Sequence, residues 1–413
     1  MTLYLIVCNL KRSVNVKDNK LSTNSKFLMI CDLMYSTTGI FVSTFLVAYF
    51  LKITNESIVQ ISIFYMIIYA LLSLGNLLIG KIVKIKPKYR TKILSIGAIL
   101  RALFILLISL LKEKIAIYFS LIAILYALAE VFYWVAHETI FIEVTTNQNR
   151  KDYMALKTIF SKLINIIAPI VLGASIELYS FSKIAIYIFI ISVIQIIASL
   201  KIKNNNLKKE KIEEYSINKF INSLDKNQKN KIKKYLKSAV AYGVIESSVQ
   251  SLVVIITIMT FKTSFNLGVL TSLFSICSML ALYLYKKYYN KKNSKIVLYT
   301  CSTLILLGVV GLVFDINKIT LIIYNFLYTV SISILNVVYN TKKGDLVKEC
   351  NIKKWKIEYV VYVDLFIAAG RVLGYSLMLI AGIFNNIVIF KILLVIVSFF
   401  APIYTKLMQE VEK

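Results

Sequence analysis

Apolar runs of about 20 residues recur along this chain and fall into two blocks, one on each side of a long polar stretch. Each run is long enough to cross a hydrocarbon core about 30 Å thick as a helix. The polar stretch covers residues 201–237 and is dense in lysine and asparagine. A soluble core does not need runs of this length, and 58% of the residues are apolar. The sequence therefore predicts an all-α polytopic membrane protein.

Each block contains six apolar runs, so we predict twelve transmembrane helices in two six-helix bundles. The first bundle occupies 27–200, with spans at 27–50, 58–80, 93–111, 115–141, 157–178 and 183–200. The second occupies 238–406, with spans at 238–261, 264–285, 296–314, 319–341, 358–382 and 387–405. Tails at 1–26 and 407–413 and the basic linker at 201–237 complete the predicted domain organisation.

The net charge of +28 is distributed unevenly between the two sides of the predicted bundles. Loops after the second, fourth, sixth, eighth and tenth spans are basic. The loops on the other side hold only Lys52, Lys112, Lys114, Lys183, Lys262 and Lys318. Because basic loops stay in the cytoplasm, we expect a multi-pass protein of the plasma membrane with the linker and both termini in the cytoplasm. Bases that lie in loops, and not on one domain face, do not predict a nucleic-acid partner.

Cysteine and histidine usage gives no sign of a metal centre. The chain has a single histidine, and five cysteines without paired spacing: Cys8, Cys31, Cys277, Cys301 and Cys350. We therefore expect no disulfide framework, metal site or cofactor. We expect no enzyme either, because the sequence shows no phosphate-binding glycine loop, nucleophile elbow or metal-ligand cluster. The alternative class is a polytopic protein that does not transport, such as a sensor or an intramembrane enzyme.

Six spans, a long basic linker and six more spans resemble the plan of the major facilitator superfamily over nearly the whole chain. The loop after the second span is similar to that family's signature through Gly80, Lys81 and the bases that lead to Arg90. In the family, an aspartate of this signature latches the cytoplasmic ends of the two bundles. Here Lys84 stands at that position and Pro87 replaces the second glycine. Lysine cannot accept the same hydrogen bonds, so we predict a latch that differs or is weaker.

The resemblance implies a secondary transporter of a small molecule that works by alternating access between two pseudo-symmetric bundles. Residues 168–173 are similar to a span-five motif of exporters, which favours export over an uptake symporter. The basic residue that many proton-linked exporters carry in span four is not evident here. We expect a monomer in the lipid bilayer with the proton as coupling ion and a substrate of unknown identity. The abundance of lysine, asparagine, isoleucine and tyrosine suggests a bacterial source with an AT-rich genome.

Glu130 is the favoured candidate among the charges inside the spans. An acid or base at the centre of a membrane helix costs about 2.5–3.5 kcal/mol, so such residues are functional candidates. Trp134, His137 and Glu138 follow Glu130 on one helical face. We predict that Glu130 binds substrate or carries the proton, against the alternative of a hydrogen bond to a neighbouring helix. For His137 we favour a capping role at the cytoplasmic helix end, and a zinc site is not supported.

Asp364 and Arg371 lie seven residues apart, on one face of the eleventh span. Glycines at 370 and 374 would let a neighbouring helix approach closely. Arg371 is a candidate counter-ion or contact for an anionic substrate. The alternative is an ion pair with Asp364 or with a carboxylate of another span.

The first and seventh spans, which the resemblance makes symmetry mates, carry comparable polar stripes. Asp32 lies on the first, and Glu246 and Gln250 lie on the seventh, each with nearby hydroxyl residues. These stripes fit a polar cavity, although hydroxyl side chains also join helices without a further role. Arg101, in the third span, is expected to pair inward with Asp32 or Glu130 as a structural bridge.

Overall fold

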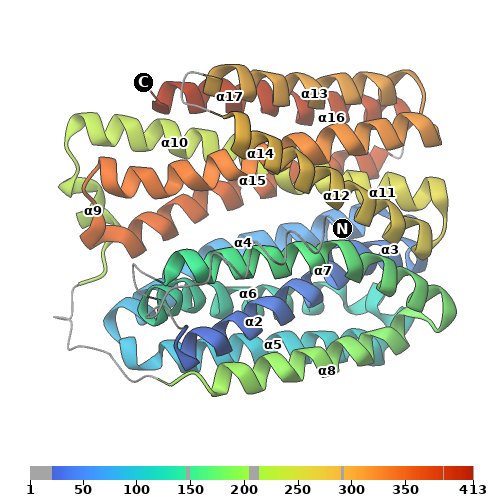
Figure 1. The fold of residues 1–413 in the computed structure, drawn as a ribbon. Coiled ribbons are helices and arrows are strands. Elements are labelled where there is room, and N and C mark those ends of the chain that lie inside the picture. Colours follow the sequence, from blue (N-terminus) through green and yellow to red (C-terminus); the bar gives the residue numbers. More distant parts are fainter. Residues whose placement is uncertain (1–20, 146–148, 204–213, 290–292, 385, 413) are drawn as a thin grey trace, which may run out of the picture.

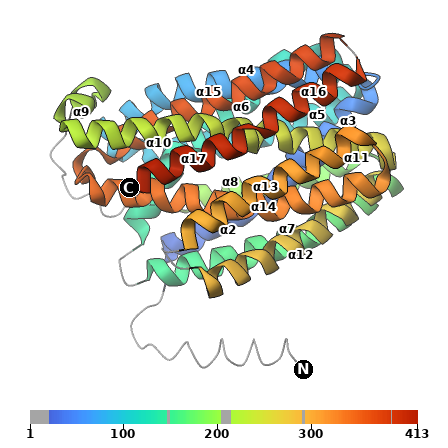
Figure 2. The same cartoon turned by 90° about the horizontal axis from the view of Figure 1, so that it is seen from above.

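The computed structural model describes residues 21–145, 149–203, 214–289, 293–384 and 386–412. The chain forms two layers of long helices that run side by side along one direction (Figure 1). The lower layer in Figure 1, here called the first half, contains α2 to α8, and the upper layer, the second half, contains α10 to α17. Figure 2 shows the same arrangement turned by 90°.

The first half is built from six helical segments. The first segment joins α2 (Thr23–Ile40), the π-helix η1 (Phe41–Leu46) and α3 (Val47–Ile53). The others are α4 (Ile58–Ile85), α5 (Arg90–Leu111), α6 (Ile115–Val144), α7 (Arg150–Leu178) and α8 (Phe181–Leu200).

The second half repeats this plan after the short helix α9 (Ile217–Ser223). Its first segment joins α10 (Lys226–Val244), the π-helix η4 (Ile245–Val249) and α11 (Gln250–Phe261). The others are α12 (Ser264–Tyr288), α13 (Ser294–Phe314), α14 (Lys318–Glu349), α15 (Lys356–Phe384), and α16 (Ile387–Ser398) with α17 (Phe400–Glu412).

The predicted twelve membrane-crossing helices are all present. Within the described ranges, ten helical segments are long and apolar enough to span a membrane. One of them, Pro87–Val144, contains both α5 and α6, which pack against each other and reverse direction near Lys112, where φ is +48°. The seventh predicted span is formed by α10, η4 and α11 together. The fold is an all-α membrane protein with two six-helix bundles.

Helix starts follow from capping residues that the sequence supplies. The side chains of Ser57, Thr263 and Asn317 accept hydrogen bonds from backbone N–H groups in the first turns of α4, α12 and α14, respectively. These contacts satisfy donors that have no partner within the helix. Asp225 and Gln228 form a reciprocal capping box that begins α10 inside the polar stretch 201–237. The end of that stretch is therefore helix.

The two halves touch along paired helices, with α4 against α15 and α7 against α12. The second contact depends on glycine. A Cβ on Gly268 would lie 2.2 Å from the Pro169 carbonyl oxygen, and one on Gly173 would lie 2.5 Å from the Ser264 carbonyl oxygen. Small residues allow such backbone contact between membrane helices.

The two π-helical segments occupy matching places, since each interrupts the first membrane-crossing segment of its half. π-bulges often lie at functional sites because they turn side chains out of the regular helical register. Here η1 reaches a cavity between the halves, and η4 supplies Glu246 to an ion pair beside that cavity.

Candidate functional site

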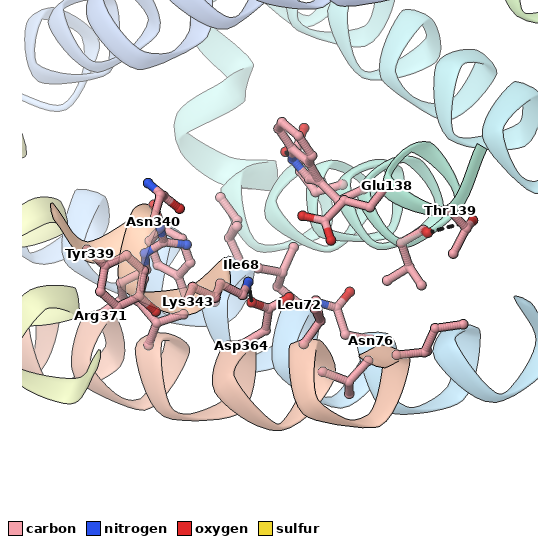
Figure 3. A pocket seen from close by; sticks show the side chains of 18 of the residues that line it. Ile68, Leu72, Asn76, Glu138, Thr139, Tyr339, Asn340, Lys343, Asp364 and Arg371 are labelled. Carbon is pink, nitrogen blue, oxygen red and sulfur yellow. Dashed lines mark hydrogen bonds and ion pairs between the residues drawn. The ribbon is translucent and has the colours of Figure 1, made fainter. Parts of the chain in front are cut away.

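A cavity of about 410 Å³ lies between the two halves. The first half contributes residues of η1, α4 and α6 to its wall, and the second half contributes residues of α14 and α15. The cavity reaches the end of the bundle where α9 lies, here called the linker end, through Ile142 and Lys356. Figure 3 shows how several of the lining side chains face this space. A volume in this range suits a small-molecule ligand.

Glu130 lines the deep part of the cavity and is 7% exposed. Its Oε1 atom lies 2.5 Å from Nη1 of Arg101 on α5. Its Oε2 atom accepts hydrogen bonds from the hydroxyl of Tyr35 and, at 2.9 Å, from Nε1 of Trp134. Three donors from three helices therefore hold this one carboxyl group.

Arg101 is only 1% exposed and bridges the interior of the first half. Its Nε donates to Oγ1 of Thr38 at 2.9 Å, and its guanidinium lies 3.8 Å from the centre of the Tyr35 ring. Of the two partners that the sequence suggested, the structure gives Glu130 and not Asp32. Arg101 stands behind the cavity wall and is not among the residues that line it.

The second half contains a matching pair, in which Nε of Arg371 lies 2.9 Å from Oε2 of Glu246 on η4. Of the two ion pairs that the sequence suggested for Arg371, the structure therefore gives the one with a carboxylate of another span, Glu246, and not the one with Asp364. Asp364 instead contacts Nζ of Lys343 on α14 at 3.0 Å (Figure 3). Arg371 also lies over the ring of Tyr69, 4.9 Å from its centre, so a residue of the first half touches this base.

Aromatic rings form the floor between the two ion pairs. Tyr65 and Tyr69 of α4 both stack on Tyr375 of α15, with ring centres 4.9 Å and 5.8 Å apart. The hydroxyl of Tyr375 lies 2.5 Å from Oγ of Ser251 on α11. The two ring contacts join the halves at the deep end of the cavity, and the hydrogen bond ties Tyr375 to α11 within the second half.

At the linker end, Glu138 of α6 faces the second half across the cavity. Its carboxylate points toward the pair of Lys343 and Asp364 (Figure 3). Lys356, at the start of α15, lines the same part of the cavity. Within the described part of the chain, neither Glu138 nor Lys356 has an ion pair within 4.0 Å, which leaves both charges available.

Asp32 and His137 form a separate buried cluster and are not among the cavity-lining residues. Nε2 of His137 lies 2.6 Å from Oδ1 of Asp32. The Oδ2 atom of Asp32 accepts from the hydroxyl of Tyr153 at 2.7 Å and contacts Nζ of Lys157 at 3.0 Å. The predicted capping role of His137 is wrong because α6 continues to Val144, two turns further, and the histidine is 4% exposed.

Of two further sequence candidates, the structure places the side chain of one, Trp134. Trp134 lines the cavity beside Glu130, on the predicted face of α6. The side chain of Gln250 lies outside the described residues. Among the residues that the structure describes, no group of three or more His, Cys, Asp or Glu side chains could hold a metal ion.

The signature loop joins the two halves at the linker end. Lys84, near the end of α4, forms an ion pair with Glu358 in the first turn of α15, and its ammonium lies 5.1 Å from the centre of the Trp355 ring. Glu358 is 0% exposed. The latch therefore differs from the family pattern as predicted, since a lysine of the first half pairs with an acid of the second half. Sequence reasoning missed Glu358, although an acid at the start of a predicted span could have drawn attention to it.

The remaining residues of this loop have other contacts. Arg90 pairs with Glu143 of α6, and its Nε donates to the Val83 carbonyl at 2.9 Å. Lys81 is exposed. A Cβ on Gly80 would lie 3.0 Å from the Val361 side chain. Gly80 thus permits close packing of α4 on α15.

The segment around α9 is packed against this latch. Phe220 is 0% exposed and contacts the rings of Trp355, Tyr359 and Tyr362. Burial, with the charge of Glu358 nearby, raises the pKa of Tyr215 to about 12, so its phenol is neutral at physiological pH. Helix α9 is therefore packed against the second half.

We expect that replacing Lys84 with glutamate lowers the free energy of unfolding by about 2 kcal/mol, because it places two acids together at a buried position. The double variant Lys84→Glu with Glu358→Lys should recover most of this loss. Lys81→Glu, an equal charge change at an exposed position of the same helix, is the matched control. Thermal unfolding in detergent compares these three purified variants with the unaltered protein. A double variant as unstable as Lys84→Glu would contradict the pairing.

Comparison with known families matches residues 25–349 to the model of the Major Facilitator Superfamily. No curated protein matches the sequence. Among solved structures, the nucleoside transporter NupG is 12% identical, with a TM-score of 0.69, over 95% of this chain and 99% of that one. A POT family transporter in complex with 5-aminolevulinic acid is 12% identical, with a TM-score of 0.69, over 94% and 96%.

A bacterial homologue of the iron transporter ferroportin, in its inward-facing state, is also similar. It is 12% identical, with a TM-score of 0.66, over 94% of this chain and 98% of that one. At these identities the similarity establishes the fold alone.

Proposed function

Because the chain belongs to the major facilitator superfamily, a superfamily of secondary transporters, we propose that it exports a small solute by alternating access in exchange for protons. The observation that carries this proposal is the cavity between the halves, whose wall contains charged residues of both. A solute bound there contacts both halves at once. Movement of one half against the other can then expose it to one side of the membrane at a time.

The proposed proton carrier is Glu130. It lines the cavity and is paired with Arg101, which lies behind the wall. Protonation of Glu130 would remove the charge that compensates Arg101 and weaken the link between α5 and α6. Two arrangements of the first half that differ in this link would bind a proton on Glu130 with different affinities. Coupling requires such a difference.

Export is the proposed direction because residues 168–173 resemble a motif of exporters. This segment lies where α7 meets α12, at the close contact of Pro169 and Gly173 with the second half. Close packing of these two helices gives the halves a fixed line of contact, about which they can move.

We further propose that the linker end faces the cytoplasm and that the membrane is the plasma membrane. The basic loops after α4, α8 and α14 support this orientation. A reporter that is active only in the cytoplasm should be active when it is inserted within 204–230 and when it is joined after residue 413. Inactivity at either position would contradict the orientation.

Transport can be tested in inverted membrane vesicles that contain the protein and a trapped pH-sensitive dye. The test panel consists of amino acids, peptides, nucleosides and organic cations, added with and without an imposed pH gradient. We expect one class to enter in a gradient-dependent way and to release protons from the lumen. Vesicles without the protein and vesicles with a protonophore are the controls. Gradient-driven uptake only in right-side-out vesicles would indicate a symporter, and no flux in either orientation would contradict transport.

A further inference from the structure

The charges that line the cavity are sorted between the halves. Among the described residues, the first half contributes two acids, Glu130 and Glu138, and no base. The second half contributes three bases, Lys343, Lys356 and Arg371, and one acid, Asp364. One wall is therefore negative and the opposite wall is net positive.

Lys343 and Asp364 pair within the wall of the second half, which leaves Lys356 and Arg371 as the excess positive charges of that wall. The other two ion pairs do not remove the polarity of the cavity. The partner of Glu130 is Arg101, and the partner of Arg371 is Glu246. Neither partner lines the cavity, so a solute meets the carboxylate on one side and the guanidinium on the other. The ring of Tyr69 lies beside Arg371 in the same space.

The same polarity holds at two depths. Glu130 and Glu138 are eight residues apart on α6, which corresponds to about 12 Å along the helix. Arg371 lines the deep part, and Lys343 and Lys356 line the part near the linker end. A dipolar solute that enters from the linker end can therefore keep one orientation along the whole cavity.

We propose that the transported solute is a zwitterion of amino-acid type, with its ammonium toward α6 and its carboxylate toward α14 and α15. This inference rests on the proposed transport function and specifies its substrate. A guanidinium and two ammonium groups suit a carboxylate, which they bind through charge-assisted hydrogen bonds. Rings of Tyr69, Tyr126 and Trp134 line the space between the walls and offer contact to a cation or an apolar side group.

The arrangement also disfavours solutes with a single charge. A cation would face a wall with three bases and one acid, which is net positive, and an anion would face a wall with two acids and no base. A competing role for Glu138 and Lys356 is gating, in which the two charges pair with each other when the linker end closes. The test below separates this gating role from solute binding.

Binding is measured by thermal unfolding of the full-length protein in nanodiscs. The probes are the twenty amino acids and their alanyl dipeptides, each in three forms: unmodified, as the C-terminal amide and as the N-acetyl derivative. We expect at least one unmodified probe to raise the unfolding midpoint with an affinity at least tenfold above its own two blocked forms. Stabilisation by amides alone, by N-acetyl forms alone, or by no probe would overturn the proposal.

Two variants then test the orientation of the solute. Glu138→Gln should weaken the zwitterion about tenfold and shift the preference toward the N-acetyl form, because the negative wall has lost a charge. Lys356→Gln should weaken it similarly and shift the preference toward the amide. Lys353→Gln and Glu113→Gln remove the same charges at exposed positions outside the cavity, and should leave the preference unchanged. A change in transport rate without opposite shifts in preference would mean that Glu138 and Lys356 only form a gate, and would overturn the proposed orientation.

Counterflow in proteoliposomes separates this inference from the transport function. If a zwitterion binds but is not exchanged across the membrane, transport fails while the ligand class stands. If a singly charged solute alone binds and is exchanged, the ligand class fails while transport stands.

Discussion

Replacing Arg101 with alanine should lower the free energy of unfolding by about 3–5 kcal/mol, because it leaves the carboxylate of Glu130 without its counter-ion inside the bundle. The pair is buried, with a distance of 2.5 Å between Nη1 and Oε1. The substitution also removes the hydrogen bond from Nε to Thr38 and the stacking on the Tyr35 ring. Chemical and thermal unfolding of the purified protein in detergent give the loss directly.

The double variant Arg101→Ala with Glu130→Ala should recover most of this loss, because both buried charges are then gone. Arg150→Ala is the matched control. That arginine also binds oxygen atoms, including Oγ1 of Thr145 at 3.0 Å, but it lies at a helix end and is partly exposed. Its removal should cost no more than about 1 kcal/mol. A double variant that is no more stable than Arg101→Ala would mean that Arg101 acts through contacts other than Glu130.

The helices were predictable because hydropathy and length are local properties of the sequence. All twelve spans are found, and their errors lie mainly at the linker end. The tenth span was predicted to end at residue 341, whereas α14 continues to Glu349. Lys342 and Lys343 were read as the start of a loop, but each finds an acid in the fold, Glu349 and Asp364 respectively. A lysine with a partner can continue a helix that hydropathy alone would end.

For each arginine inside a predicted span, the sequence predicted a few candidate acids but did not identify the one that forms the ion pair. Sequence spacing puts Asp364 and Arg371 on one helical face, but two turns of one helix do not bring their charges together. Each finds a nearer partner on another helix, Lys343 for the acid and Glu246 for the base. Which helices meet depends on the packing of the whole bundle, and a single sequence does not contain that information in local form.

The interpretation of His137 failed for a local reason, because it placed the end of the helix too early. With three more residues at the end of α6, a residue expected at the membrane surface becomes an interior one beside Asp32. Glu358 was missed although Lys84 stood where an acid was expected. The exchange of a family acid for a base is a signal to search for an acid on the facing helix.

Replacing Glu130 with glutamine should abolish accumulation of solute driven by a pH gradient, by at least tenfold, while exchange of solute across the membrane continues. Glutamine keeps the size of the side chain and an oxygen that can accept from Arg101, but it cannot take up or release a proton. Alternating access requires only that the solute binds and that the halves move, so counterflow should persist at saturating solute, with Glu138 still present in the negative wall. Accumulation requires in addition that the two arrangements bind the proton differently, and this step is lost.

The measurement uses proteoliposomes with an imposed pH gradient and the solute that the unaltered protein accumulates. Asp32→Asn and Glu246→Gln are the matched controls, because each neutralises a paired acid that does not line the cavity. Both should retain coupling if their roles are structural, although Glu246→Gln leaves Arg371 without a counter-ion and should reduce stability. Before the comparison, each variant must elute as a folded protein in size-exclusion chromatography. If Glu130→Gln still accumulates solute in response to pH, Glu130 is structural, and loss of coupling in one of the other two variants would identify the acid that carries the proton.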